Sequence, residues 1–71
     1  MTETEFKKAF GNNIKTLRLA KKLKQEELAK SIGIAATTLS RIENGADFVK
    51  VSTIVKLCDV LETTPGFLFN F

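Results

Sequence analysis

The sequence predicts an all-α domain built from five helices. Two short amphipathic segments lie at its centre, with Leu28 and Ile32 before a glycine turn at Gly33 and Leu39 and Ile42 after it. Residues three or four apart lie on the same face of a helix, so each segment presents one apolar stripe to a common core. The chain has 71 residues, which is enough for one domain covering residues 1–71.

The first helix is predicted to begin after Thr2 and to run to about Lys21. Thr2 and Glu5 have the spacing of a capping box, which starts a helix. Gly11 lies inside the helix and costs about 1 kcal/mol relative to alanine. We therefore expect the opening turns to fray or the helix to begin later. The apolar positions recur every three or four residues at Phe6, Phe10, Ile14 and Leu17.

The second helix is predicted to begin at Gln25 and to end before Gly33. Gly33 follows the helix cap, where a left-handed backbone closes a helix at little steric cost. Ala29 lies where the two central helices would cross, and its small side chain allows their backbones to approach closely. Ile34 is expected to reach the core beneath the turn. The alternative interpretation is an ordinary helical hairpin in which these residues serve packing alone.

Three further segments complete the chain. The third helix ends at Asn44-Gly45, and residues 46–50 form a loop. A fourth helix follows from about Val51. Thr64 is expected to cap a short fifth helix, with Pro65 at its first position, where a missing amide proton costs nothing. The inner face of the fourth helix is formed by Ile54, Leu57, Cys58 and Leu61.

The end of the chain is unusually apolar. Four of the last five residues are large and apolar, more than a short terminal helix usually buries in its own domain. We expect part of this surface to meet another subunit, within a dimerisation region of about residues 51–71. A self-contained core followed by a loose tail is the alternative. The four residues are Phe67, Leu68, Phe69 and Phe71.

Composition argues against several classes of protein. Eleven Lys and Arg residues against eight Asp and Glu residues give a formal charge of +3, a mild bias that agrees with phosphate contact. Cys58 is the single cysteine and there is no histidine, so we expect neither a disulfide, nor a metal, nor a cofactor. No catalytic set of residues is visible, which argues against an enzyme. Without a long apolar stretch, membrane insertion and export are not expected, and the cytoplasm is the predicted location.

The chain resembles the lambda-repressor-like, or Xre-type, helix-turn-helix regulators over about residues 6–69, with the motif at residues 25–44. Among short regulators of this kind, the length and the ending at residues 64–69 look most like the controller proteins of restriction-modification systems. The residues that carry the resemblance are Ile14-Lys15-Thr16-Leu17-Arg18, Leu23, Gln25-Glu26-Glu27-Leu28-Ala29, Gly33, Leu39-Ser40-Arg41-Ile42-Glu43-Asn44-Gly45 and the stretch from Leu57 to Leu61.

This resemblance implies that the third helix enters the major groove of DNA. Arg41 is the strongest candidate for sequence specificity, because a guanidinium can pair with both O6 and N7 of a guanine. A phosphate contact is the competing role for Arg41. Because the set contains few strong donors, DNA shape is expected to carry part of the discrimination. The residues placed on the groove side are Ala36, Thr37, Thr38 and Arg41.

Four further residues are expected to contact DNA phosphates, which adds affinity without sequence information. The loop around Asp47 and Phe48 departs from the basic loop of many relatives, and Asp47 is expected to repel a nearby phosphate. The four phosphate-contact candidates are Lys24, Gln25, Asn44 and Lys50.

Arg18 and Glu43 match a family pair that bridges the first helix to the end of the third. A partly buried pair would hold the third helix in place, and removing one partner would leave the other charge stranded. The alternative is two separate surface charges, which would make a mutation of Glu43 nearly silent.

Two lysines depart from the family pattern between the first two helices. Lys22 stands where the family usually has glycine, and Lys24 stands where it usually has serine or threonine. Each change should cost about 1 kcal/mol, because lysine tolerates a left-handed backbone poorly and cannot accept a capping hydrogen bond. In exchange, two positive charges come near the DNA.

The resemblance implies a homodimer that binds a double-stranded, pseudo-palindromic DNA operator. Control would come from protein concentration and operator arrangement, with RNA polymerase as a further candidate partner and no small-molecule ligand. An antitoxin or another protein-interaction module using the same fold is the alternative function.

Overall fold

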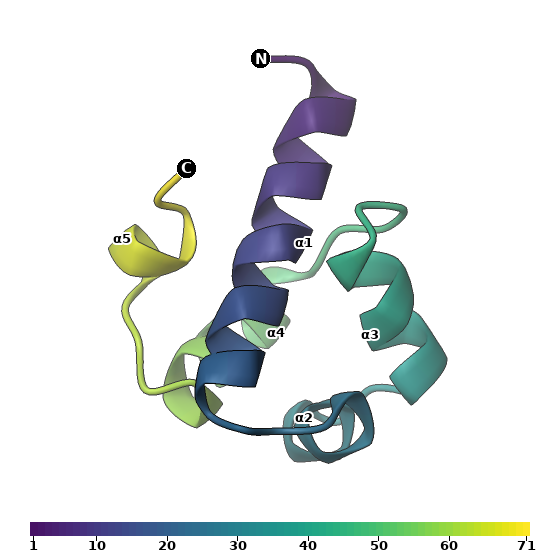
Figure 1. The fold of residues 1–71 in the computed structure, drawn as a ribbon, viewed down its shortest axis with the longest axis vertical. Helices are drawn as coiled ribbons and strands as arrows, with labels where there is room; N and C mark the ends of the chain where they lie inside the picture. The colour runs from purple at the N-terminus through teal and green to yellow at the C-terminus, as the bar shows by residue number, and fades with distance from the viewer.

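A computed structural model describes residues 1–71 of the protein and shows five helices without a β-strand. Helix α1 runs through the centre of the molecule, with α3 on one side of it and α5 on the other, while α2 crosses below its end (Figure 1). This arrangement confirms the all-α, five-helix prediction. The helices are α1 (Glu3–Ala20), α2 (Gln25–Ile32), α3 (Ala36–Glu43), α4 (Val51–Val60) and α5 (Pro65–Leu68).

Helix α1 begins with the capping box that the sequence predicts. The backbone N–H of Glu5 donates to the Thr2 hydroxyl at 3.1 Å, and the backbone N–H of Thr2 donates to Glu5 Oε1 at 2.8 Å. These two bonds satisfy amide groups that have no partner inside the helix. The helix ends at Ala20, and Lys21 forms its C-cap.

The expectation that Gly11 would weaken the start of α1 is wrong. The helix is continuous from Glu3, and Gly11 is buried. A Cβ at this position would overlap the carbonyl oxygen of Ile42 and lie 2.8 Å from that of Glu43. Glycine therefore allows the end of α3 to approach the backbone of α1, and this close packing offsets its low helix propensity.

The sequence predicts a left-handed residue at two of the four junctions between helices, and the structure has both. Lys22 has φ +58° and Gly33 has φ +75°. Lys24 begins α2 without a side-chain cap, although its backbone N–H donates to Glu27 Oε1 at 2.8 Å. Glu62, with φ +51°, is a second left-handed residue other than glycine, and it forms an ion pair with Lys21.

Residues from all five helices form one core. Ala29 is buried in the core, and Ile34 packs against the core from a half-buried position. Cys58 is free and half-buried, and burial raises the pKa of its thiol. The fully buried core consists of Phe10, Ile14, Leu28, Ala29, Ile32, Leu39, Ile42, Leu57, Leu61 and Leu68.

The end of the chain packs onto α1 more closely than the sequence indicates. Thr64 caps α5 by accepting from the backbone N–H of Phe67 at 3.2 Å. Asn13 Nδ2 of α1 donates to the carbonyl oxygens of Phe67 and Leu68. Leu68 is completely buried, so its side chain has no surface to offer a second subunit, and its place in the predicted dimer interface is corrected.

Aromatic side chains link α1, the α3–α4 loop and the end of the chain. The ring of Phe10 lies 4.8 Å from that of Phe48 and 4.9 Å from that of Phe69. Phe6 contacts the same two rings and also Phe71. We refer to Phe6, Phe10, Phe48, Phe69 and Phe71 as the aromatic cluster. It fixes the loop and the C-terminal segment against α1.

Candidate nucleic-acid interface

Helix α3 has one buried face and one open face. Leu39 and Ile42 are buried in the core, at 0% and 2% exposure. On the opposite side, Thr37 is exposed and 61% of the Arg41 side chain is exposed. This division follows from the helical repeat, because residues on the side opposite an apolar stripe point away from the core.

The four predicted base-contact residues are not equally accessible. Thr37 and Arg41 are open to solvent, whereas Ala36 is half-buried and packs against the core. Thr38 is also half-buried and faces a cavity between α3 and α4. The structure thus brings Thr37 and Arg41 together on the open face and leaves Ala36 and Thr38 at its edge.

The end of α3 is tied to α1 by the predicted ion pair. Arg18 Nε lies 2.7 Å from Glu43 Oε2, and Arg18 Nη2 lies 3.1 Å from Glu43 Oε1. The side chains are only 8% and 1% exposed. Arg18 Nη1 also donates to the carbonyl oxygen of Leu23 at 2.8 Å. The bidentate pair therefore fixes the end of α3, the end of α1 and the start of the next segment relative to one another.

Gln25 also bonds to this buried ion pair, and the sequence did not predict that contact. Its Nε2 donates to Glu43 Oε1 at 2.9 Å, so the first residue of α2 is fixed to the last residue of α3. Gln25 is half-buried, and its amide still has a free hydrogen and a free oxygen for other contacts. No local pattern signals this bond, because the two residues are 18 positions apart.

Arg41 forms a second ion pair that the sequence did not indicate. Its Nε lies 2.7 Å from Asp47 Oδ2, and its Nη2 lies 3.3 Å from Asp47 Oδ1. The hydrogen bond from Arg41 lowers the pKa of the Asp47 carboxyl, and the same bond raises the pKa of Arg41. The sequence predicts that Asp47 repels a nearby phosphate; the structure in addition pairs it with Arg41, the predicted specificity residue.

The remaining phosphate-contact candidates lie at helix ends. Lys24 is the N-cap of α2, Asn44 is the C-cap of α3, and Lys50 is the N-cap of α4. All three are exposed, and their side chains form neither a hydrogen bond nor an ion pair within the protein. They are therefore free to bind an external anion.

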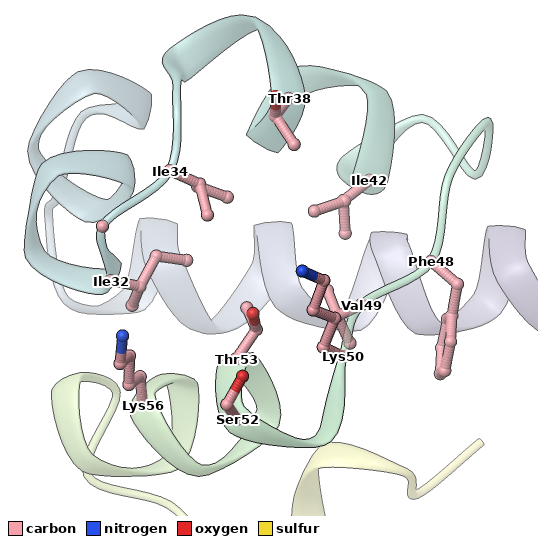
Figure 2. Close-up of a pocket in the computed structure, with 11 residues that line it drawn as sticks. Ile32, Ile34, Thr38, Ile42, Phe48, Val49, Lys50, Ser52, Thr53 and Lys56 are labelled. Atoms are coloured by element: carbon pink, nitrogen blue, oxygen red, sulfur yellow. The ribbon is translucent and has the colours of Figure 1, made fainter.

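A cavity of 290 Å³ lies beside α3. Figure 2 shows its apolar wall, formed by Ile32, Ile34 and Ile42, opposite the start of α4. The ammonium of Lys50 points into the space between α3 and α4, and Lys56 extends from α4 toward the turn at Gly33 (Figure 2). The structure has no group of acidic, cysteine or histidine side chains arranged to hold a metal ion. None of its helices is both long and apolar enough to cross a membrane.

Comparisons with known proteins point to one family. The helix-turn-helix family matches residues 14–68. The crystal structure of the restriction-modification controller protein C.AhdI from Aeromonas hydrophila has the same fold, with a TM-score of 0.81 and 34% sequence identity. The match covers 86% of this chain and 92% of that chain.

Two curated proteins are also similar in sequence. The HTH-type transcriptional repressor RghR of Bacillus subtilis is 42% identical over 55 residues, which cover 76% of this chain and 41% of RghR. The antitoxin PezA of Streptococcus pneumoniae is 44% identical over 48 residues, which cover 68% of this chain and 30% of PezA. The chain thus spans less than half the length of these two relatives, and the similarity concerns the helix-turn-helix domain.

Proposed function

Because this chain belongs to the helix-turn-helix family of DNA-binding transcription regulators, we propose that it binds a specific, pseudo-palindromic operator as a homodimer. The observation that carries this proposal is the construction of α3. One face of α3 is buried, the other presents Thr37 and Arg41 to solvent, and the buried Arg18–Glu43 pair fixes its end. A rigid helix with an open polar face suits insertion into a major groove.

Arg41 is proposed to read a guanine. Its guanidinium is exposed and long enough to reach a base edge, where it matches the O6 and N7 acceptors. Thr37 is proposed to contact the neighbouring base through its methyl or hydroxyl group. Ala36 and Thr38 lie at the edge of the open face, so we assign them secondary contacts with thymine methyl groups or the backbone.

Lys24, Gln25, Asn44 and Lys50 are proposed to contact phosphates on either side of α3. Three of them have unpartnered side chains at helix ends, which supports this role. The fourth, Gln25, keeps free donor and acceptor groups beside the buried ion pair. Phosphate contacts would set the orientation of the protein on DNA and make its affinity depend on salt.

The dimer is proposed to form through the C-terminal aromatic residues. Phe67 is 57% exposed and Phe71 is 44% exposed, and Phe69, between them in the sequence, packs on Phe10. The domain measures 30 × 24 × 22 Å. To read two half-sites on one face of an operator, the two α3 helices of such a dimer must lie about 34 Å apart, the length of one DNA turn.

The similarity to C.AhdI supports a role as a controller of a restriction-modification system. This match covers most of both chains. In this role the protein acts in the cytoplasm, where its operator lies, and dimer formation makes DNA binding sensitive to protein concentration. RNA polymerase is the proposed further partner when the bound dimer activates transcription.

Selection of a random-sequence DNA library tests this function. The wild-type protein and Arg41→Ala are compared at the same salt concentration, and the bound DNA is sequenced. We expect a two-fold-related motif for the wild type and loss of one strong guanine preference in Arg41→Ala. Weak, salt-sensitive binding without a motif in the wild type would contradict the proposal.

A second candidate function is that of an antitoxin domain, favoured by the similarity to PezA. In that case the exposed C-terminal aromatic residues would bind a toxin protein in place of a second copy of this chain. Co-expression with the product of the adjacent gene distinguishes the two functions. A stable complex that excludes the homodimer would favour the antitoxin.

A further inference from the structure

We propose that Asp47 is a positioning residue that holds Arg41 along one edge and leaves its outer edge free for guanine. The inference rests on the proposed reading of DNA by α3. It assigns a specificity role to an acidic residue of the α3–α4 loop, which acts through Arg41.

The arrangement of donors on Arg41 supports this role. A guanidinium has five N–H donors, on Nε, Nη1 and Nη2. Asp47 accepts from Nε at 2.7 Å and from Nη2 at 3.3 Å, whereas Nη1 donates to no group in the protein. The edge formed by Nη1 and the second hydrogen of Nη2 is therefore free. Two parallel N–H groups on this edge match the O6 and N7 acceptors of guanine.

The loop backbone fixes the position of Asp47 relative to Arg41. The backbone N–H groups of Ala46 and Asp47 both point to the Arg41 carbonyl oxygen, at 2.8 Å and 3.4 Å. Gly45, with φ +78°, makes this reversal, and a Cβ there would lie 2.8 Å from the Cα of Lys8. Asp47 therefore contacts Arg41 twice, because its backbone N–H bonds to the Arg41 carbonyl oxygen and its carboxylate accepts from the Arg41 side chain.

Phe48, the residue that follows Asp47, also holds the loop in place. The ring of Phe48 lies 4.8 Å from Phe10 and 5.8 Å from Phe6, within the aromatic cluster on α1. Asp47 is consequently held between a backbone hydrogen bond and a packed aromatic ring. A carboxylate that is fixed in this way can restrict the rotamers of a flexible arginine.

The exposure of the pair indicates that its main effect is on conformation. The side chains of Arg41 and Asp47 are 61% and 41% exposed, so solvent screens their attraction and the pair adds little stability. Ordering the Arg41 side chain before binding removes part of the entropy cost of contacting a base. The benefit is therefore expected at the base pair that Arg41 reads.

The test compares affinity for the selected operator with affinity for the same operator in which the Arg41-dependent guanine is replaced. We expect Asp47→Asn to reduce this discrimination by roughly tenfold, which lies within the range of one bidentate arginine–guanine contact. Binding to the replaced operator should be unchanged or stronger. Asp59→Asn is the matched control, because Asp59 is exposed on α4 and forms no ion pair. It should leave discrimination unchanged.

A double-mutant cycle isolates the link to Arg41. In an Arg41→Ala protein, the further change Asp47→Asn should have no effect on discrimination, because the group that Asp47 positions is gone. A loss of discrimination that persists without Arg41 would overturn the proposal. Equal strengthening of binding to both operators by Asp47→Asn would also overturn it, since Asp47 would then only oppose phosphate.

A measurement without DNA separates this inference from the proposed function. The {¹H}–¹⁵N NOE of the Arg41 Nε–H group should indicate a restricted side chain in the wild type and a mobile one in Asp47→Asn. Equal mobility in both proteins would overturn the positioning role while leaving DNA binding by α3 intact. A wild type with restricted Arg41 but no sequence preference would overturn the proposed function, and the specificity role with it.

Discussion

At the scale of single residues, the buried charged side chains of this protein hold helices in position relative to one another. Glu43 accepts from Arg18 and Gln25, which come from two other helices. The carboxylate is 1% exposed, so any charge left without its partner would be poorly solvated. The network therefore determines where α3 ends relative to α1 and α2.

We predict that Glu43→Gln destabilises the fold and weakens DNA binding. Glutamine has the same shape but leaves the buried Arg18 charge without a counter-charge, which should lower the free energy of unfolding by about 3 kcal/mol. Urea denaturation followed by circular dichroism measures this change. Glu26→Gln is the control, since Glu26 is exposed at the start of α2 and has no ion-pair partner. A loss of stability equal to that of the control would show that Glu43 behaves as a surface charge.

At the scale of helices, two departures from ordinary helix rules have different causes. Gly11 is unfavourable for an isolated helix but is required where α1 meets the end of α3. Lys24 is unfavourable as an N-cap, and no tertiary contact of its side chain compensates for this. Packing therefore explains the first departure, and we propose contact with DNA as the reason for the second.

We predict that Gly11→Ala destabilises the protein, although alanine favours helices by about 1 kcal/mol. The added methyl group must displace the backbone of α3, and overpacking of this kind costs roughly 1–3 kcal/mol. Thermal unfolding provides the measurement. Asn12→Ala on the exposed face of the same helix should be neutral or stabilising. A higher melting temperature for Gly11→Ala would show that α1 and α3 do not approach as closely as described.

Lys24→Ser should stabilise the protein and reduce the salt dependence of its DNA binding. A serine hydroxyl can accept a backbone hydrogen bond at the start of α2, which contributes about 1 kcal/mol and raises the melting temperature by roughly 4–8 °C. Loss of one phosphate contact should reduce the slope of log affinity against log salt by about 1. Lys30→Ser is the matched control, because it also replaces one lysine by serine but lies inside α2, where serine cannot form the N-cap. An unchanged salt slope for Lys24→Ser would remove Lys24 from the phosphate contacts.

At the scale of the whole molecule, the C-terminal segment packs against the core and is also the proposed site of dimer contact. Leu68 completes the core and Phe69 packs on Phe10, whereas Phe67 is 57% exposed and Phe71 is 44% exposed. The proposed interface therefore continues directly from the core. Because a domain of 71 residues buries a modest fraction of its surface, burial of these rings in a dimer would also stabilise the fold.

Phe67→Glu is expected to shift the dimer to a monomer at micromolar concentration. Phe67 is the suitable position because its ring is 57% exposed, whereas a charge at Phe69 would also damage the aromatic cluster. Sedimentation velocity measures the oligomeric state. Leu19→Glu, at an exposed apolar residue of α1, should remain dimeric. A Phe67→Glu protein that stays dimeric would place the interface elsewhere.

The sequence alone determined the positions of the helices and the buried face of α3. Capping at Thr2 and Thr64, the left-handed turn at Gly33 and the apolar stripe of α3 all depend on residues within about four positions of one another. Such patterns can be read from the sequence because the helical repeat relates them directly.

Only the tertiary structure decided which helices meet and which polar groups pair. Neither the contact of Gly11 with the end of α3 nor the bond from Gln25 to Glu43 follows from local spacing. The Arg41–Asp47 pair depends on the reversal at Gly45. The physical reason is that these contacts depend on the crossing of helices and on loop conformation, which the packing of the whole core sets.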